Sequence, residues 1–311
     1  MNRNPYRDVE ALQTGVNDDA ALLDTPPFKA ARLDLAVVCI AGADAIEFVH
    51  GQFSGDCRAL SAGDTLLTAW CSPKGRVLFM PRLLRARDDT LYALLPNAQA
   101  QAFVKRLRMF VLRAKVTVDD CTSSHGVLAI DGLAAPPNIE WDELIGARDG
   151  TRRWLLGPRA AVADRWDALA MPALSANGMR LATVRRGEPS LDAALTDQFL
   201  PQELNLDWLA GVSFNKGCYP GQEIVARVKF RGTVKRRVQR LGLAGVAAIV
   251  PGSRLLGSDG ASRGTVLTSA HAAAGQTELL AVVDLDAGQL TFEGGATPLT
   301  PLSLPYAMDS A

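Results

Sequence analysis

The feature that most constrains the fold is an alternation of short β-type runs with helical segments along residues 33–118. Residues 33–40 (LDLAVVCI) form a β-rich run, and apolar residues in segment 45–60 recur near helical spacing. Segment 65–86 predicts two strands joined by a Ser-Pro-Lys-Gly turn, in which Pro73 sets φ and Gly75 can adopt a positive φ. We therefore expect a strand, a helix and a hairpin in this order.

Two further segments extend this pattern. Residues 89–96 (DTLYALLP) predict another strand. Residues 97–118 predict a helix, with Phe103, Leu107 and Phe110 on one side, that leads back to a strand. Because hairpin strands and helices follow one another in this way, the sequence predicts an α+β fold with antiparallel sheets and not a doubly wound one.

The length of 311 residues favours two or three domains. Segment 132–150 is loop-rich and carries a double proline, so we place a connection there. From about residue 241 the chain changes to short strands broken by glycines, which is typical of a small β-barrel. We predict an N-terminal α+β domain (1–135), a second α+β domain that carries the KGCYPGQE motif (136–240) and a C-terminal β-barrel (241–311).

Composition limits the classes of partner and compartment. Thirty-three basic residues balance thirty-three acidic ones, so any anion-binding surface must come from local clustering. The N-terminus has no apolar segment of signal-peptide type, and the longest apolar runs are too short to span a bilayer. Five cysteines without a CxxC pair and three separated histidines indicate neither a metal site nor a disulfide framework. We expect a cytoplasmic monomer with no membrane partner.

Segment 214–232 (FNKGCYPGQEIVARVKFRG) is the most distinctive stretch. Lys216 stands two residues before Cys218, where its positive charge would favour a reactive thiolate. Gly217 and Gly221 would shape the loop by allowing a sharp turn or a close approach to a ligand. The other interpretation is that Cys218 is a small buried apolar residue in a plain turn. The residues alone leave both interpretations open.

A basic cluster follows this motif without any acidic residue. The alternation in 227–231 places Arg227, Lys229 and Arg231 on one face of a predicted strand. That face is either simply solvated or a seat for phosphates and carboxylates, including those of nucleic acid. The cluster consists of Arg227, Lys229, Arg231, Lys235, Arg236, Arg237 and Arg240.

Polar residues also precede the motif. Gln202, Glu203 and Asn205 follow Pro201, and their amides and carboxylate can read the donor and acceptor edge of a heterocycle. Helix capping is an equally good explanation for them. The sequence contains no GxGxxG, P-loop, HExxH or GxSxG pattern, so it favours neither a nucleotide fold, a metalloprotease nor a serine hydrolase.

The run KGCYPGQEIVARVKFRG, followed by VKRRV, resembles the signature of the YgfZ family, whose members are relatives of the glycine-cleavage T-protein. The resemblance covers roughly residues 30 to 285. Further matching segments have the order and spacing of that family: IAGADAIEFVHGQFSGDCRAL, CSPKGRVLFMPRLL, RRGEPSLD and FLPQELNLDWLAGVSF. The resemblance implies a T-protein-like arrangement of domains around a central cavity, with a β-barrel as the last domain.

The resemblance further implies a tetrahydrofolate-type ligand, and it implies no metal. It connects the chain with tRNA modification and with the maintenance of iron-sulfur enzymes, above all those of tRNA thiolation, so these enzymes, tRNA and folate are the expected partners. Leu35 and Met179 stand where some bacterial members carry tryptophans, and Arg185 stands where many relatives carry an acid. The folate-binding residues expected on this basis are Leu35, Met179, Arg185, Gln202, Glu203, Tyr219, Gln222 and Glu223.

Phe79 and Met80 occupy the place of the acidic pair in the T-protein signature. A carboxylate that could accept charge during one-carbon transfer is therefore missing, and whether the chain is an enzyme stays open. The first hypothesis is a folate-binding accessory protein with Cys218 as its reactive group and a basic cluster (Arg227, Lys229, Arg231, Lys235 and Arg236) that binds anionic partners. The alternatives are a divergent tetrahydrofolate-dependent one-carbon transferase and a non-catalytic scaffold that binds RNA or protein.

Overall fold

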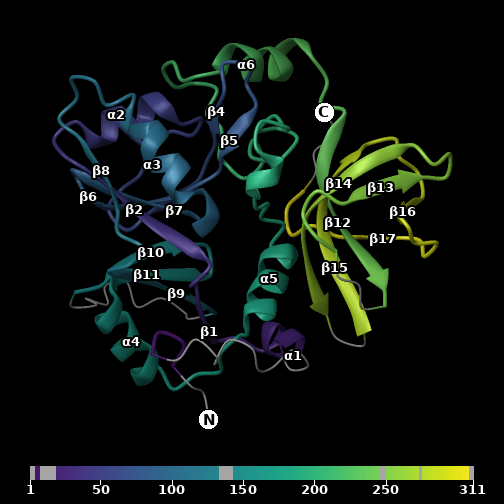
Figure 1. The fold of residues 1–311 in the computed structure, drawn as a ribbon, viewed down its shortest axis with the longest axis horizontal. Coiled ribbons are helices and arrows are strands. Elements are labelled where there is room, and N and C mark those ends of the chain that lie inside the picture. Colours follow the sequence, from purple (N-terminus) through teal and green to yellow (C-terminus); the bar gives the residue numbers. More distant parts are fainter. Residues whose placement is uncertain (1–3, 8–18, 133–142, 246–248, 273–274, 308–311) are drawn as a thin grey trace.

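The computed structural model describes residues 4–7, 19–132, 143–245, 249–272 and 275–307. It contains three antiparallel sheets and a two-stranded hairpin (Figure 1). The double proline of the predicted connection, at 136 and 137, lies outside the described residues.

The first sheet has five strands in the order β3-β6-β7-β2-β8. The bounds are β2 (Leu35–Ala41), β3 (Thr65–Leu67), β6 (Arg82–Arg87), β7 (Thr90–Pro96) and β8 (Thr117–Asp120). Helices α2 (Ala45–Gln52) and α3 (Ala100–Arg108) supply part of its core, and the 3-10 turn η2 (Asn97–Gln99) precedes α3. In α3 the buried residues Phe103, Val104 and Leu107 share one face. These strands and helices confirm the elements predicted from periodicity, but α3 ends at Arg108, so Phe110, predicted on its apolar side, lies in the turn after the helix and is exposed.

The predicted hairpin is formed by β4 (Trp70–Cys71) and β5 (Val77–Phe79). The Gly75 amide donates to the Ser72 carbonyl at 2.8 Å, and Gly75 has a φ of 73°. Segment 65–86 nevertheless holds four strands and not the predicted two, because β3 and β6 pair with each other in the first sheet while β4 and β5 form a separate ladder. The irregular stretches at Thr68 and Pro81 separate the two ladders.

The second sheet has the order β1-β9-β11-β10. The bounds are β1 (Phe28–Ala31), β9 (His125–Asp131), β10 (Ile145–Asp149) and β11 (Arg152–Pro158). Helix α4 (Arg159–Ala168) covers one face, where Val162 and Trp166 pack against Leu155. The opposite face packs against the first sheet through a shared apolar cluster that includes Trp154 and Val37.

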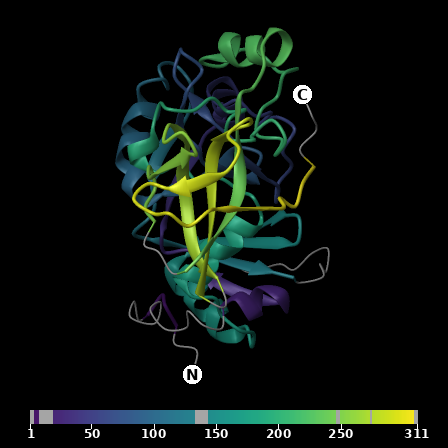
Figure 2. The ribbon, with the colours of Figure 1, turned by 90° about the vertical axis from the view of Figure 1, so that its right-hand side faces the viewer.

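The C-terminal part is a six-stranded antiparallel sheet that curls into a half-barrel (Figures 1 and 2). Its order is β16-β13-β14-β15-β12-β17, with bounds β12 (Arg236–Ala244), β13 (Arg254–Gly257), β14 (Ser262–Ala272), β15 (Gln276–Asp284), β16 (Leu290–Phe292) and β17 (Thr300–Leu302). The predicted α+β class, with antiparallel sheets and a C-terminal barrel-type module, is confirmed. The predicted domain boundaries stay a prediction. Strands β1 and β9 of the predicted first domain share a sheet with β10 and β11 of the predicted second domain. Strand β12 begins at Arg236, before the predicted start of the third domain at residue 241.

Helix α5 (Ala176–Arg185) lies between the second sheet and the half-barrel (Figure 1). The Ser175 hydroxyl caps it by accepting a hydrogen bond from the Gly178 amide. Helix α1 (Asp19–Asp24) packs beside it, and η3 (Ala193–Leu195) follows in the connection toward the motif. Because α5 also contacts β14, this helix joins the two parts of the molecule.

Helix α6 (Gln222–Arg231) corrects the strand predicted over residues 227–231. Ile224, Val225 and Val228 have the i, i+1, i+4 spacing of one helical face, and Val225 is fully buried. When residues 227–231 are taken alone, their alternation of basic and apolar residues fits a strand as well as it fits a helix. The segment crosses the end of the molecule outside all three sheets, where a helix can satisfy its own backbone hydrogen bonds (Figure 1).

Candidate functional site

A cavity of about 500 Å³ lies where the first sheet, α5 and the half-barrel meet. The end of β1, the connection that leads into β2 and the end of β7 form one wall, α5 forms the second, and β14 forms the third. Residues from each wall include Arg32, Asp34, Pro96, Met179, Thr183 and Leu267. A volume of this size is ordinary for a small-molecule site. We call this space the central cavity.

A smaller space of about 70 Å³ continues from the central cavity between the two N-terminal sheets. Both spaces are lined by Arg32, Pro96, Thr183 and Ser190, so they are neighbours. We call the smaller space the arm. Its other walls include Leu35, Met80, Arg82, Trp154 and Glu188.

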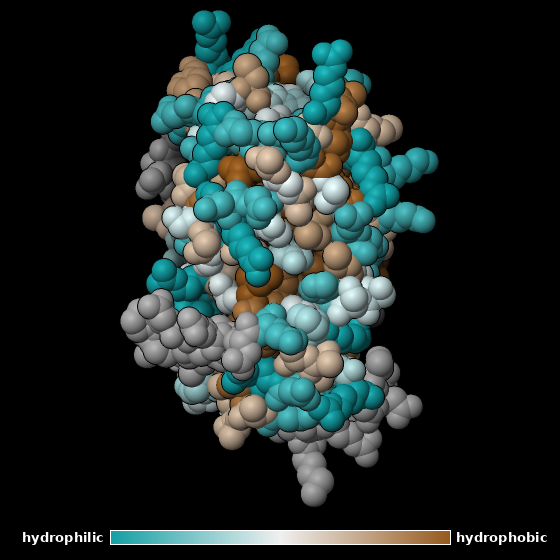
Figure 3. All heavy atoms as spheres, turned by 90° about the vertical axis from the view of Figure 1, so that its left-hand side faces the viewer, coloured by the Kyte–Doolittle hydropathy of each residue, from teal (hydrophilic) through white to brown (hydrophobic). Residues whose placement is uncertain are grey.

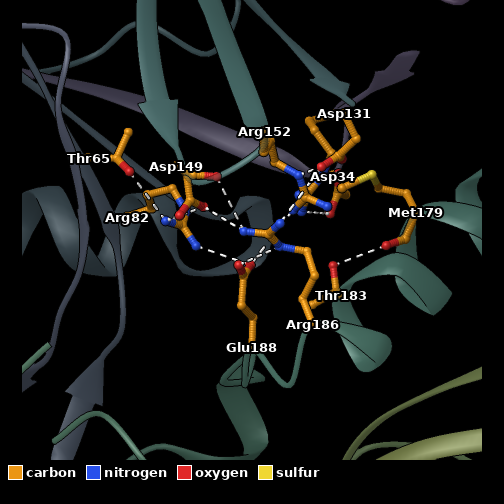
Figure 4. A network of polar contacts seen from close by, with 11 residues as sticks. Asp34, Thr65, Arg82, Asp131, Asp149, Arg152, Met179, Thr183, Arg186 and Glu188 are labelled. Atoms are coloured by element: carbon orange, nitrogen blue, oxygen red, sulfur yellow. Dashed lines mark hydrogen bonds and ion pairs between the residues drawn. The ribbon is translucent and has the colours of Figure 1, made fainter. Parts of the chain in front are cut away.

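A network of buried charges forms the inner end of the arm (Figure 4). Arg82 contacts Asp149 at 2.9 Å and Glu188 at 3.1 Å, and the Arg186 Nε lies 2.8 Å from Glu188. Arg152 donates to Asp131 at 2.8 Å. Figure 4 shows these side chains pointing toward one centre from strands of both N-terminal sheets and from the segment after α5. The tertiary structure therefore assembles this wall from four separate parts of the chain.

Glu188 is the shared carboxylate of that network. Burial raises the pKa of Glu188, but the positive charges of Arg82, Arg152 and Arg186 outweigh burial and lower it to about 2. Glu188 is thus ionised at neutral pH and is poorly matched to proton transfer there. Its role in the structure is to hold three guanidinium groups in position.

Trp154 lies at the centre of the arginines. The guanidinium carbons of Arg32, Arg82 and Arg152 lie 5.6, 5.3 and 5.5 Å from its ring centre, within the range of cation–π contact. Its indole Nε1 is buried and has no hydrogen-bond acceptor within the described part of the chain. Trp154 lines the arm, so one wall of the arm carries an indole whose N–H is unpaired.

Asp34 brings a negative charge to the central cavity. Arg32 donates two hydrogen bonds to its carboxylate, both at 2.8 Å. Burial raises the pKa of Asp34, but the charge of Arg32 and these hydrogen bonds lower it below its usual value. The cavity wall therefore presents an ionised carboxylate, which can accept hydrogen bonds from the N–H groups of a ligand.

The residues predicted to bind folate are divided between several places. Met179 lines the central cavity, and Leu35 lines the arm. Arg185, predicted to face the ligand, instead contacts Glu278 at 3.1 Å and Asp24 at 3.3 Å, because its position on α5 directs it toward the half-barrel. Its neighbour Arg186 joins the network behind the arm.

Gln202 and Glu203, predicted to read the ligand edge, hold the backbone instead. The Gln202 side-chain amide donates to the carbonyl of Val225 in α6 at 2.7 Å. The Glu203 carboxylate accepts from the Leu200 amide at 2.8 Å and contacts Arg236 at 2.8 Å. Both residues are buried, and this ion pair also occupies the charge of Arg236, which we predicted to bind an anionic partner.

Lys216, predicted to activate Cys218, has its ammonium on backbone carbonyls in the structure, and its effect on the thiol stays a prediction. Its ammonium donates to the carbonyls of Phe53 at 2.5 Å and Gly55 at 3.1 Å, and also to the carbonyl of His50. Burial is the largest influence on the pKa of Lys216 and lowers it. Lys216 therefore fastens the loop to the end of α2, while Cys218 is exposed to solvent.

The remaining motif residues form a compact turn. Tyr219 is buried, with its ring centre 5.1 Å from the Lys216 ammonium, and burial raises the pKa of its hydroxyl. The Gln222 side-chain amide donates to the Lys216 carbonyl at 3.5 Å. Glu223 is exposed in the first turn of α6.

The two loop glycines differ. Gly221 has a φ of 79°, and a Cβ there would lie 2.4 Å from the Ser72 carbonyl oxygen and 2.7 Å from the Gly75 Cα. Its backbone therefore packs directly on the turn of the β4–β5 hairpin. A Cβ on Gly217 would have no heavy atom within 4 Å. Only Gly221 has surroundings that exclude a side chain.

The place of the T-protein acidic pair is apolar. The Phe79 ring packs 5.6 Å from Trp70 and 5.3 Å from Phe103, and Met80 lines the arm. Among the described residues, no three His, Cys, Asp or Glu side chains come together as metal ligands. None of the helices in the described ranges has the length and apolar character needed to cross a membrane.

The fold is that of the T-protein. The chain superimposes with a TM-score of 0.78 on the crystal structure of glycine cleavage system aminomethyltransferase T from Bartonella henselae, at 15% identity, covering 94% of this chain and 89% of that one. At this identity the likeness shows the fold alone. No model of a protein family matches the sequence.

The sequence is also 33% identical over 304 residues to the tRNA-modifying protein YgfZ of Enterobacter sp. (strain 638), covering 89% of this chain and 92% of the relative. The chain belongs to the YgfZ family, as its motif predicted.

Proposed function

We propose that this chain binds a tetrahydrofolate-type ligand in the central cavity and serves as an accessory protein in tRNA modification and iron-sulfur enzyme maintenance. The observation that carries the proposal is the cavity of about 500 Å³ at the junction of three parts of a T-protein-like fold. The membership of the chain in the YgfZ family, with a relative named as tRNA-modifying, supports the second half of the proposal.

The donors and acceptors around the cavity fit a pterin. Such a ring has flat faces and an edge that carries both N–H donors and acceptors. The Asp34 carboxylate would accept from the donors, and the unpartnered Trp154 Nε1 would donate to an acceptor in the arm. Met179 and Leu267 would contact a ring face.

The exposed thiol of Cys218 would be the reactive group that meets a macromolecular partner. One cysteine is too few to hold a conventional iron-sulfur cluster alone, so this thiol would act together with groups of the partner. If Cys218→Ala fully restored thiolated tRNA and iron-sulfur enzyme activity in a strain that lacks the protein, this role of Cys218 would be rejected.

A one-carbon transferase is the less supported alternative. Phe79 and Met80 provide no carboxylate where the T-protein signature has its acidic pair. The nearby Glu188 is ionised and held by three arginines. An assay of tetrahydrofolate turnover with an aminomethyl donor tests this alternative directly, and we expect no turnover.

Calorimetry with tetrahydrofolate tests the ligand half of the proposal. Thr183 lines both spaces, and Thr183→Trp would fill them, so we expect binding to the wild type and its loss in this variant. Gln101→Trp, on the exposed side of α3, is the matched control and should bind normally. Asp34→Asn, a smaller change, should weaken binding by about tenfold through a lost charge-assisted hydrogen bond. Normal binding by folded Thr183→Trp would refute the proposal.

A further inference from the structure

The seven basic residues between positions 227 and 240 fall into two groups in the structure. Three are paired: Arg236 with Glu203, Arg237 with Asp207, and Arg240 with Glu278. The other four are exposed, and no acid within the described ranges forms an ion pair with them: Arg227, Lys229, Arg231 and Lys235. Glu223 is the acidic residue on α6, so positive charge predominates on this helix and the residues after it.

An exposed aromatic side chain lies among these cations. Phe230 is 68% exposed, although large apolar side chains usually avoid such exposure. Its ring meets Phe214 edge to face at 5.9 Å, and the Lys229 ammonium lies 5.8 Å from the Phe214 ring centre. We call the surface formed by Phe214, Arg227, Lys229, Phe230, Arg231 and Lys235 the α6 face.

The α6 face lies at one end of the molecule. Figures 1 and 2 place α6 outside the sheets, at the end opposite α4. In Figure 3 hydrophilic side chains project from that same end. Helix α6 begins four residues after the exposed Cys218. The face is accessible to a macromolecule.

We propose that the α6 face binds RNA, with phosphates on Arg227, Lys229, Arg231 and Lys235 and an unpaired base stacked on Phe230. Unpaired cations around an exposed aromatic ring are the combination by which proteins hold single-stranded nucleic acid. An acidic protein would satisfy the cations but would leave Phe230 without a flat partner. This inference rests on the proposed role in tRNA modification and names the surface that meets the tRNA.

Helical geometry places Arg227, Phe230 and Arg231 on one side of α6, whereas Lys229, two residues from both arginines, does not face them and lies beside Phe214. Arg227 and Arg231 are four residues apart and thus lie on the same side of α6, about 6 Å apart along its axis. Phe230 adjoins Arg231 and is three residues from Arg227, so the ring belongs to the same side. A strand over 227–231 would instead have turned Phe230 away from the cations.

The test measures binding of a labelled, unmodified tRNA transcript over a series of salt concentrations. For Arg227→Ala combined with Arg231→Ala, we expect weaker binding and a slope of log K against log salt that is smaller by about 1.4, since each phosphate contact on a single strand contributes about 0.7. The charge-matched control is Arg87→Ala combined with Lys105→Ala, two exposed cations on β6 and α3, and it should bind like the wild type.

Phe230→Ala should lower affinity for the tRNA at least about fivefold, in line with loss of one stacked base, and Phe230→Tyr should preserve it. The same variants should bind a blunt RNA duplex like the wild type. The inference is overturned if the double arginine variant keeps the wild-type salt slope; the face would then be assigned to an acidic protein.

The two proposals can fail separately. The α6 variants should bind tetrahydrofolate normally, because the α6 face and the central cavity have no residue in common. Thr183→Trp should bind tRNA normally. Loss of RNA binding in Thr183→Trp, with the protein folded, would contradict the assignment of RNA to α6, whereas absent folate binding in the wild type would contradict only the proposed ligand.

Discussion

The central cavity and the α6 face both depend on arginine, but they use it in opposite ways. Around the arm, Arg82, Arg152 and Arg186 are largely enclosed and share carboxylates. On α6, Arg227 and Arg231 are exposed and have no ion-pair partner within the described residues. Buried guanidinium groups require partners because desolvated charge is costly, whereas exposed ones keep their charge available. The interior arginines therefore form part of the cavity wall, whereas the surface arginines keep their charge available to a partner.

The largest expected effect concerns the buried side of this comparison. Glu188→Ala leaves three guanidinium groups without their shared carboxylate, and we expect a loss of about 3 to 5 kcal/mol in the free energy of unfolding. Urea denaturation measures it. Glu47→Ala removes the exposed partner of Arg58 and should cost less than about 1 kcal/mol. Equal losses in the two variants would show that burial does not distinguish these pairs.

The second prediction concerns the stability that ionised Glu188 provides and its loss at low pH. The pKa of Glu188 is lowered from its usual 4.5 to about 2, so its stabilisation is complete above about pH 4.5 and is lost as the pH falls toward 2. The shift corresponds to about 3 kcal/mol. Unfolding free energies between pH 5 and about pH 2 should fall more steeply for the wild type than for Glu188→Gln. Parallel curves would contradict the lowered pKa.

The third prediction concerns the turn that supports the exposed thiol. Gly221→Ala places a Cβ against the Ser72 carbonyl at a positive φ, and we expect a loss of about 2 kcal/mol. Gly217→Ala, in open space, should change the free energy of unfolding by less than about 0.5 kcal/mol. Thermal unfolding of both variants measures the difference between their losses of stability. Equal losses would show that the loop does not pack on the hairpin.

The smallest effect is expected for thiol reactivity. Lys216 binds backbone carbonyls, so Lys216→Met should change the alkylation rate of Cys218 at neutral pH by less than about twofold. Mass spectrometry after iodoacetamide treatment measures the rate. Cys71 is an internal control because burial raises its pKa to about 12, and it should stay unlabelled. A tenfold slower reaction would restore Lys216 as the activating group.

Much of the fold could be predicted because periodicity and turn residues act locally. The run at 33–40, the Ser-Pro-Lys-Gly turn and the apolar face of α3 each form the element that their spacing predicts. The strand predicted at 227–231 was wrong, because five alternating residues fit two geometries. The spacing of Ile224, Val225 and Val228 was the signal for a helix.

The candidate site was less predictable. The resemblance led to Met179 and Leu35, which line the cavity and the arm. It did not lead to Asp34, Trp154 or Glu188, which come from three distant segments and meet only in the folded chain. One feature of the sequence could have indicated Asp34 as a site residue: Arg32 and Asp34 stand directly before a buried strand. Trp154 and Glu188 had no such local signal.

The sequence by itself determined most of the elements, the tight turn of the motif and the family, because these depend on residues that are neighbours along the chain. Only the tertiary structure decided which cations are paired, which carboxylate faces the cavity and where the Lys216 ammonium binds. Charge interactions depend on distance and burial, and residues far apart in sequence acquire both only when the sheets pack together.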